Sequence, residues 1–402
     1  MKYAVILGDG MAGYPMPERE NKTCLQCANK RTIDSLARMS KVGTAKTVPQ
    51  GFKPGSDVAN LSVMGYAPAQ FYTGRSPLEA ASIGIPLKDT DVTLRCNLVT
   101  LSDAPVYAEK RMIDYSAGEI STEEARELIV FLKEHFDRAP FTLFAGISYR
   151  HCLVVENGKT GHDFTPPHDI SDRVITDYLP KGEGADAFLA MMERSYELLR
   201  NHPVNVKRVA EGKNPANSVW FWGEGTKPSM QPFESLYGKK GGVISAVDLV
   251  KGLGILSGMK TIEVDGATGN WDTNFSGKAN AAADALLGGL DFVYVHMEAP
   301  DECGHHGDAE KKIYSIEQVD GVVNTILSRM RDAGERVRLL ILPDHPTPIC
   351  LKTHTSDPVP FLLYDSGEEA GNGANSYCEE EAQKTGLHLE RGWELIQLLF
   401  DK

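Results

Sequence analysis

Seven aspartate, histidine and serine side chains, spread along this 402-residue chain, could together carry out metal-assisted chemistry. Two stand four residues apart in HMEAPDECGHHGD, two are adjacent in LLILPDHPTP, and one lies in KTHTSDPVP. Each stretch adjoins an apolar run, so the side chains could meet at one edge of a sheet. Mixed imidazole and carboxylate ligands suit Zn²⁺ or Mn²⁺, and two such ions about 4 Å apart would clamp a phosphoryl group. The set is Asp9, Ser56, Asp301, His305, Asp344, His345 and His354.

Ser56 has two readings in the stretch PGSDVANLSVMGY. It follows Pro54 and Gly55 and precedes apolar residues at helical spacing, which is typical of a helix N-cap. A helix N-terminus also binds phosphate, and a cation beside the serine would stabilise its alkoxide. Ser56 is therefore either a cap or a nucleophile.

The stretch GDGMAG, residues 8 to 13, matches the dinucleotide-binding pattern G-x-G-x-x-G. Pro15 and Pro17 follow it, and prolines so placed prevent the helix that this fingerprint requires. We expect Asp9 instead to bind a cation at the end of a strand.

Composition excludes several classes of protein. The net charge of −13 argues against nucleic acid as a partner, because phosphate backbones need clustered Lys and Arg. No apolar run approaches the roughly 20 residues of a membrane span, and no signal peptide is visible. Seven scattered cysteines, with only Cys24 and Cys27 in a C-x-x-C pair, indicate reduced thiols in a cytoplasmic protein.

The periodicity predicts an alternation of strands and helices in the C-terminal part, which is typical of a parallel α/β sheet that the N-terminal strand joins. The middle of the chain reads as an inserted α+β domain. We expect a core of residues 1–70 and 241–402, an insert of 71–240 and a hinge at Lys239–Gly242. The expected strands are Tyr3–Leu7, Val92–Leu101, Phe141–Ile147, Thr261–Val264, Phe292–Met297, Arg338–Leu342 and Pro360–Leu363. The expected helices are Thr122–Phe136, Ala185–Arg200, Ser245–Leu256, Gly277–Leu287, Ile313–Arg331 and His388–Phe400.

The ordered set of seven residues resembles the alkaline phosphatase superfamily, whose members share an α/β core, two metal ions and a Ser or Thr nucleophile. More narrowly, six stretches look like the archaeal-type, cofactor-independent phosphoglycerate mutases. They are ILGDGMAG, PGSDVANLSVMGY, FYTGRSPLEAASIGI, RCNLVTLSD, ANSVWFWGEG and THTSDPVP, and they span nearly the whole chain.

The resemblance implies a role for each of the seven residues. Asp301, His305 and His354 would bind one metal ion. The other ion would be bound by Asp9, Ser56, Asp344 and His345. Ser56 would take the phosphate of 3-phosphoglycerate as phosphoserine and return it to the 2-hydroxyl of the reoriented glycerate. We expect Mn²⁺, with Zn²⁺, Co²⁺ and Mg²⁺ also compatible.

The inserted domain should close over the small phosphorylated acid and supply cations for it, since arginine forks suit carboxylate and phosphate. For each candidate the alternative is a structural role, such as a surface ion pair or, for the lysine, a solvated helix position. WFW, residues 220 to 222, reads as strand core. The candidates are Arg75, Arg95, Arg150, His151 and Lys278.

Three other functions stay open at the level of sequence. The same core chemistry could serve an alternative-type homoserine kinase, or a metal-dependent phosphatase or phosphodiesterase that uses water as acceptor. A catalytically inactive binding protein would usually lack a ligand or the nucleophile, and all seven positions are filled here. The sequence gives no indication of the oligomeric state.

Overall fold

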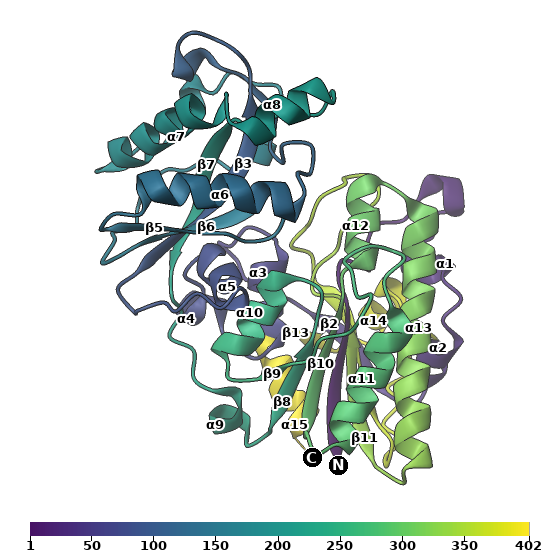
Figure 1. Ribbon diagram of the computed structural model, residues 1–402. Helices are drawn as coiled ribbons and strands as arrows, with labels where there is room; N and C mark the ends of the chain where they lie inside the picture. Colours follow the sequence, from purple (N-terminus) through teal and green to yellow (C-terminus); the bar gives the residue numbers. More distant parts are fainter. Residues whose placement is uncertain (402) are drawn as a thin grey trace. The chain divides into compact units, whose positions relative to one another are not determined.

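The computed structural model describes residues 1–401, which form two compact units. Unit 1 comprises Met1–Tyr72 and the chain from Met230 on, and unit 2 comprises Thr73–Ser229. The sequence-based boundaries lay at 70/71 and 240/241. The two units are described separately below (Figure 1).

Unit 1 is built on an eight-stranded sheet with the order β13-β2-β12-β11-β1-β10-β8-β9. All neighbouring strands are parallel except β12, which is antiparallel to both β11 and β2. This arrangement confirms the predicted mostly parallel α/β sheet. The strands are β1 Lys2–Gly8, β2 Lys41–Ala45, β8 Gly241–Ile244, β9 Lys260–Thr261, β10 Phe292–Met297, β11 Val337–Leu342, β12 Val359–Asp365 and β13 His388–Leu389.

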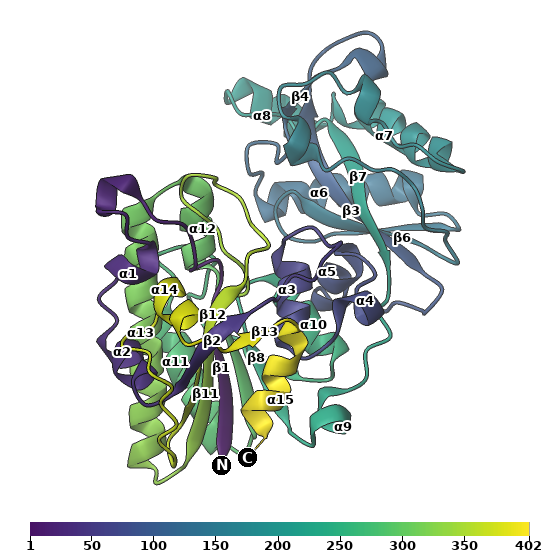
Figure 2. The same cartoon turned by 180° about the vertical axis from the view of Figure 1, so that it is seen from behind.

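Helices cover both faces of this sheet, because its central strands are apolar on both sides. One face carries α1, α2, α11, α12, α13 and α14 (Figure 1), and the other carries α3, α10 and α15 (Figure 2). The bounds are α1 Cys24–Cys27, α2 Arg31–Ala37, α3 Ser56–Val63, α4 Pro68–Phe71, α9 Phe233–Tyr237, α10 Asp248–Leu256, α11 Phe275–Leu287, α12 Ala299–His306, α13 Ala309–Asp332, α14 Glu379–Lys384 and α15 Leu395–Phe400.

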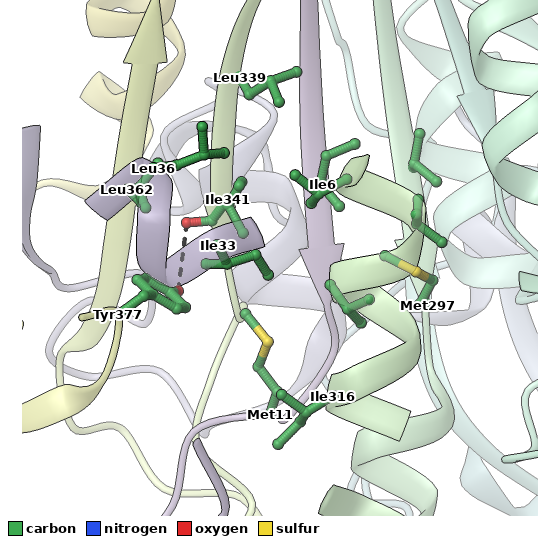
Figure 3. Close-up of a cluster of buried hydrophobic side chains, with 14 of the residues drawn as sticks. Ile6, Met11, Ile33, Leu36, Met297, Ile316, Leu339, Ile341, Leu362 and Tyr377 are labelled. Atoms are coloured by element: carbon green, nitrogen blue, oxygen red, sulfur yellow. Dashed lines mark hydrogen bonds between the residues drawn. The ribbon is translucent and has the colours of Figure 1, made fainter. Parts of the chain in front are cut away.

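The hydrophobic core under α2 and α13 is drawn in Figure 3. Successive strand side chains point to opposite faces, so alternate residues such as Leu339 and Ile341 meet the same helices. Tyr377 is fully buried here, and its hydroxyl donates to the carbonyls of Pro360 at 2.9 Å and Ile341 at 3.4 Å. The cluster therefore buries a tyrosine without leaving its polar group unpaired.

Unit 2 has a five-stranded antiparallel sheet in which β3 pairs with β4, β6 and β7, and β5 pairs with β6. Its core includes Trp220 and Trp222 of β7, as WFW predicted. The strands are β3 Val92–Leu101, β4 Met112–Asp114, β5 Phe141–Phe144, β6 Arg150–Val155 and β7 Ser218–Thr226. The helices are α5 Ser76–Ser82, α6 Thr122–Phe136, α7 Ala185–Leu199 and α8 Pro203–Ala210.

Three sequence-based expectations about the backbone of unit 1 are wrong, and one of them is the strand expected over Thr261–Val264, since β9 ends at Thr261. The single helix expected over His388–Phe400 is instead β13, a 3₁₀ turn at Gly392–Glu394 and α15. Pairing with β2 extends the first residues, and the Gly392 amide donates to the Lys46 carbonyl at 2.9 Å. The hinge expected at Lys239–Gly242 is also wrong. Its two glycines are the first residues of β8, and side chains of neighbouring strands and loops pack closely against them.

The loop after β1 contains no helix, which confirms that GDGMAG is not a dinucleotide fingerprint. Met11 and Ala12 form bridges to Pro346 instead. Cys24 and Cys27 lie on α1 as free thiols. Among residues 1–401, no helix has both the length and the apolar character needed to cross a bilayer.

Removing the Tyr377 hydroxyl should weaken the core. We expect Tyr377→Phe to lower the free energy of unfolding by about 1–2 kcal/mol, because two buried carbonyls lose a donor. Urea denaturation of the metal-free protein measures this. Tyr314→Phe, at a tyrosine that is 43% exposed, should change it by less than about 0.5 kcal/mol. Equal effects of the two substitutions would contradict the role given to the hydroxyl.

Candidate active site

Three adjacent parallel strands, β11, β1 and β10, deliver the predicted ligands to one edge of the unit 1 sheet. Asp9 directly follows β1, Asp344 and His345 follow β11, and helix α12 follows β10. His354 lies in the loop that leads into antiparallel β12. In open α/β sheets this carboxyl edge is where ligands bind.

Helix α12 holds Asp301 and His305 one turn apart on the same face. Pro300 occupies its first turn, where a missing N–H costs nothing, and Gly307 ends it in the left-handed region with φ 73°. The D-x-x-x-H pair is therefore part of a short capped helix, and the alternative of a surface turn is wrong.

Asp301, His305 and His354 form what we call the first ligand group. His305 Nε2 lies 2.9 Å from His354 Nε2 and 3.2 Å from Asp301 Oδ2, and His354 Nε2 lies 3.5 Å from Asp301 Oδ1. His305 Nδ1 lies 3.0 Å from the Lys352 carbonyl, to which it can donate. That bond orients the ring so that Nε2 faces the group.

Asp9, Asp344 and His345 form the second ligand group, and all three are buried. His345 Nε2 lies 3.5 Å from Asp9 Oδ1 and 3.4 Å from Asp344 Oδ2. Ser56 Oγ lies 3.1 Å from the same nitrogen. The His345 and His354 rings are 4.0 Å apart between centroids, so the two groups adjoin. The structure thus brings all seven predicted residues together.

Ser56 is the first residue of α3 and not its cap. The cap position belongs to Gly55, and no side chain caps this helix. The reading of Ser56 as a helix N-cap is therefore wrong. Its hydroxyl points to the second ligand group, while neighbouring Asp57 accepts hydrogen bonds from the Val58 amide at 2.9 Å and the Tyr72 hydroxyl at 2.6 Å.

The two ligand groups concentrate negative charge, and no lysine or arginine among residues 1–401 forms an ion pair with their aspartates. Burial first, and then the charges of Asp344 and Asp301, raise the pKa of Asp9 well above its usual range. Burial also acts to raise the pKa of Asp301, but hydrogen bonds from His305 and His354 bring it well below that range. Among residues 1–401, only histidines form ion-pair contacts with the three aspartates.

An orphaned oxygen indicates that the second group fits a cation. Asp9 Oδ1 is buried and has no hydrogen-bond partner. Burial lowers the pKa of His345, so its ring is uncharged at neutral pH and can offer a lone pair. Carboxylate oxygens and neutral imidazole nitrogens are the donors that divalent transition metals prefer.

Sequence reasoning missed several residues that hold the ligands in place. The Asn60 amide donates to Asp344 Oδ2 at 2.8 Å and accepts from the Tyr294 hydroxyl at 2.7 Å. The Thr347 hydroxyl donates to Asp301 Oδ1, and His296 Nε2 lies 2.8 Å from Asp9 Oδ2. Most of these residues lie within apolar helix or strand patterns, where their polarity was the only sign of a functional role in the sequence.

Lys278 is neither a solvated helix lysine nor a surface cation. It is fully buried on α11, and its ammonium donates to the His296 carbonyl at 3.0 Å. Burial lowers its pKa to about 8, against an opposing effect of Glu298. This buried position behind the second ligand group shows that the expectation of a solvated lysine on the helix surface is wrong.

Unit 2 gathers all three predicted arginines around one carboxylate. Glu79 accepts from Arg75 Nε and Arg95 Nε, each at 2.9 Å. Burial acts to raise the pKa of Glu79, but the charges of the three arginines bring it below its usual value. The Arg95 guanidinium stacks 4.1 Å from the centre of the Trp222 ring. Burial lowers the pKa of Arg95 to about 10, so it remains charged at neutral pH. Three cations against one carboxylate leave a positive cluster suited to an anion.

His151 does not belong to this positive cluster. It is buried, and its Nδ1 accepts from the Gly146 amide at 3.0 Å. Burial first, and then the charge of Arg150, lower its pKa to about 3. A neutral buried imidazole is not a cation, so these contacts give no support to the expected cationic role of His151.

The chain matches a family model described as 2,3-bisphosphoglycerate-independent phosphoglycerate mutase over residues 37–205. It is 48% identical to the protein of that name from Methanosarcina barkeri, over 99% of both chains. It is 50% identical to a probable 2,3-bisphosphoglycerate-independent phosphoglycerate mutase from Geobacter sulfurreducens, over the whole of both chains.

Two solved structures share the fold of this chain. The PH0037 protein from Pyrococcus horikoshii is 29% identical, with a TM-score of 0.83 over 100% of this chain and 96% of that one. A cofactor-independent phosphoglycerate mutase from Thermoplasma acidophilum shares the fold, with a TM-score of 0.65, 24% identity and 99% of each chain covered.

The first ligand group should bind divalent cations more tightly as the pH rises. The hydrogen bond to Asp301 raises the pKa of His305 to about 9, so below that pH a proton must leave before the nitrogen can bind a metal. We expect apparent Mn²⁺ affinity to rise by up to about tenfold per pH unit from pH 7 towards 9.

Calorimetry in buffers of different ionisation enthalpy should show at least one proton released on binding. The variant His305→Ala should lose this group's binding. Affinity that does not change between pH 7 and 9, with no proton release, would contradict the assignment.

Proposed function

This chain belongs to the 2,3-bisphosphoglycerate-independent phosphoglycerate mutase family, and from that premise we propose that it interconverts 3-phosphoglycerate and 2-phosphoglycerate through a phosphoserine at Ser56. The observation that carries the proposal is the convergence on His345 Nε2. Ser56 Oγ, Asp9 Oδ1 and Asp344 Oδ2 all lie within 3.5 Å of that one nitrogen. A hydroxyl placed among buried metal-type donors would become an activated nucleophile when a metal ion is bound there.

Two divalent ions would be held by the first and second ligand groups, with Ser56 as an additional ligand at the second. When bound, such ions would lower the pKa of the serine hydroxyl and neutralise charge on a phosphoryl group. The buried carboxylates of Asp9 and Asp344 support this, because they lack any lysine or arginine contact among residues 1–401. We expect Mn²⁺, with Zn²⁺, Co²⁺ and Mg²⁺ also compatible.

Group transfer by Ser56 would occur in two balanced steps. Ser56 Oγ loses its proton and forms a bond to phosphorus as the bond to the 3-oxygen of the substrate breaks, and the released glycerate oxygen takes up a proton. The 2-hydroxyl of the glycerate then loses its proton and attacks the phosphoserine, which restores the Ser56 hydroxyl. No water or second phosphorylated cofactor enters either step.

The positive cluster of unit 2 would bind the anionic substrate. Arg75, Arg95 and Arg150 outnumber Glu79, and planar guanidinium groups suit both carboxylate and phosphate. We propose these three arginines as its partners and the inserted domain as the substrate-binding part. His151 and Lys278 are not proposed as direct contacts, since the His151 imidazole is neutral and the Lys278 ammonium donates to the His296 carbonyl.

Isomerisation should depend on metal and on nothing else added. Chelator-stripped protein with Mn²⁺ restored and 3-phosphoglycerate, without bisphosphoglycerate, should yield 2-phosphoglycerate and little inorganic phosphate. Samples quenched and treated with chelator are read by phosphorus NMR. Free phosphate as the main product would indicate a phosphatase. Transfer only from ATP to homoserine would indicate the kinase reading.

Replacing the nucleophile should abolish turnover. We expect Ser56→Ala to reduce kcat by at least about 10⁴-fold and to prevent acid-stable labelling of the protein by substrate carrying ³²P. Ser62→Ala is a matched control on the same helix, since its buried hydroxyl has no hydrogen-bond partner. Labelling that persists in Ser56→Ala would rule out the phosphoserine.

A further inference from the structure

We propose that His296, held by Ser245, is a positioning residue that turns Asp9 so that Oδ1 faces the second ligand group. It would thereby set the cation affinity of that group and not of the first. The inference rests on the proposed two-ion site. It adds a determinant that lies behind the ligands and touches neither the substrate nor the reacting atoms.

The geometry is a continuous chain of contacts through the interior of unit 1. His296 and Ser245 are both buried, on β10 and directly after β8. His296 Nδ1 lies 3.1 Å from Ser245 Oγ, and its Nε2 lies 2.8 Å from Asp9 Oδ2. Ser245 Oγ in turn accepts from the Val247 amide at 3.0 Å.

When Asp9 is ionised, the direction of each hydrogen bond from Asp9 through His296 to Ser245 is determined. A carboxylate only accepts, so His296 Nε2 must carry the hydrogen. In a neutral ring Nδ1 is then an acceptor, so the Ser245 hydroxyl donates to it while accepting from the Val247 amide. The contacts of Ser245, which lie outside the ligand groups, thus hold the ring in the orientation that presents the Nε2 hydrogen to Asp9.

The two oxygens of Asp9 have different surroundings. Oδ2 accepts from His296, whereas Oδ1 is buried without a hydrogen-bond partner and lies 3.5 Å from His345 Nε2. Fixing one oxygen of a carboxylate fixes the direction of the other. The orphaned oxygen is therefore aimed at the point where Asp344 Oδ2 and Ser56 Oγ also converge.

The backbone around this contact is equally constrained. The Asp9 amide donates to the Met297 carbonyl at 2.9 Å, and β1 and β10 pair in register with Leu7 opposite His296. Lys278 Nζ donates to the His296 carbonyl at 3.0 Å. With both backbones held, the His296 ring decides the rotamer of Asp9.

A merely structural histidine would give a different result from a positioning one. If His296 only fills the core, its replacement should lower the stability of the protein. It should then reduce the cation affinity of both groups equally or of neither group. If it positions Asp9, replacement should weaken the second group alone. Outer partners of metal ligands typically contribute about 10–100-fold in affinity.

The test measures Mn²⁺ binding to chelator-stripped protein by calorimetry, which needs no turnover. Two backgrounds isolate the groups, since Asp301→Asn disables the first and Asp344→Asn disables the second. In the Asp301→Asn background, His296→Met should weaken the remaining site about 10–100-fold. Ser245→Ala should weaken it by a smaller factor, because Nε2 still donates. In the Asp344→Asn background, His296→Met should leave affinity unchanged.

Rescue and control variants complete the design. His296→Gln places an amide donor near the former Nε2 and should recover most of the affinity lost in His296→Met. Tyr14→Phe, outside both ligand groups, should have no effect in either background. Thermal melts of the metal-free variants check folding, and the smaller Ser245→Ala change keeps the test valid if His296→Met does not fold.

Unchanged second-group affinity in His296→Met and Ser245→Ala would overturn the inference, as would equal weakening of both groups. Failure of the otherwise unaltered protein to bind two ions would instead overturn the proposed two-ion site. The two failures are therefore distinguishable.

Discussion

Mutual repulsion among buried carboxylates is the constraint on which the rest of unit 1 depends. Asp9, Asp301 and Asp344 lie out of solvent without lysine or arginine contacts among residues 1–401. Burying an unpaired charge costs several kcal/mol, so such an arrangement is stable only with protons or cations bound. The neighbouring histidines and polar partners are the groups that make this charge tolerable.

The topology of the sheet brings the aspartates and the groups that surround them to one edge. Because β11, β1 and β10 are adjacent and parallel, three loops from distant parts of the sequence end at the same place. Behind them, Asn60 and His296 direct the carboxylates, while Lys278 ties the backbone of β10 to α11. The geometry of the two ligand groups thus derives from strand order first and from interior hydrogen bonds second.

Sequence patterns predicted the site residues that follow strands, but they did not identify the polar residues within strands that contact the site. Asp344 and His345 follow a clear apolar run, so their location needed only the rule that ligands gather at carboxyl edges. His296 sits within the run FVYVHM and reads as core, because periodicity cannot tell which partner a buried polar atom finds. His388–Phe400 was misread as one helix because pairing with β2 overrides local propensity.

The order of the strands also bears on how the protein is made. β1 is the first of the described strands to be synthesised, yet its two partners, β10 and β11, begin at Phe292 and Val337. Unit 2 is one uninterrupted segment, Thr73–Ser229, whose internal contacts are all available earlier. During synthesis the apolar residues of β1 therefore wait without a sheet while the whole of unit 2 emerges. The nascent chain spends that interval with a strand open to association, a condition that favours engagement by chaperones.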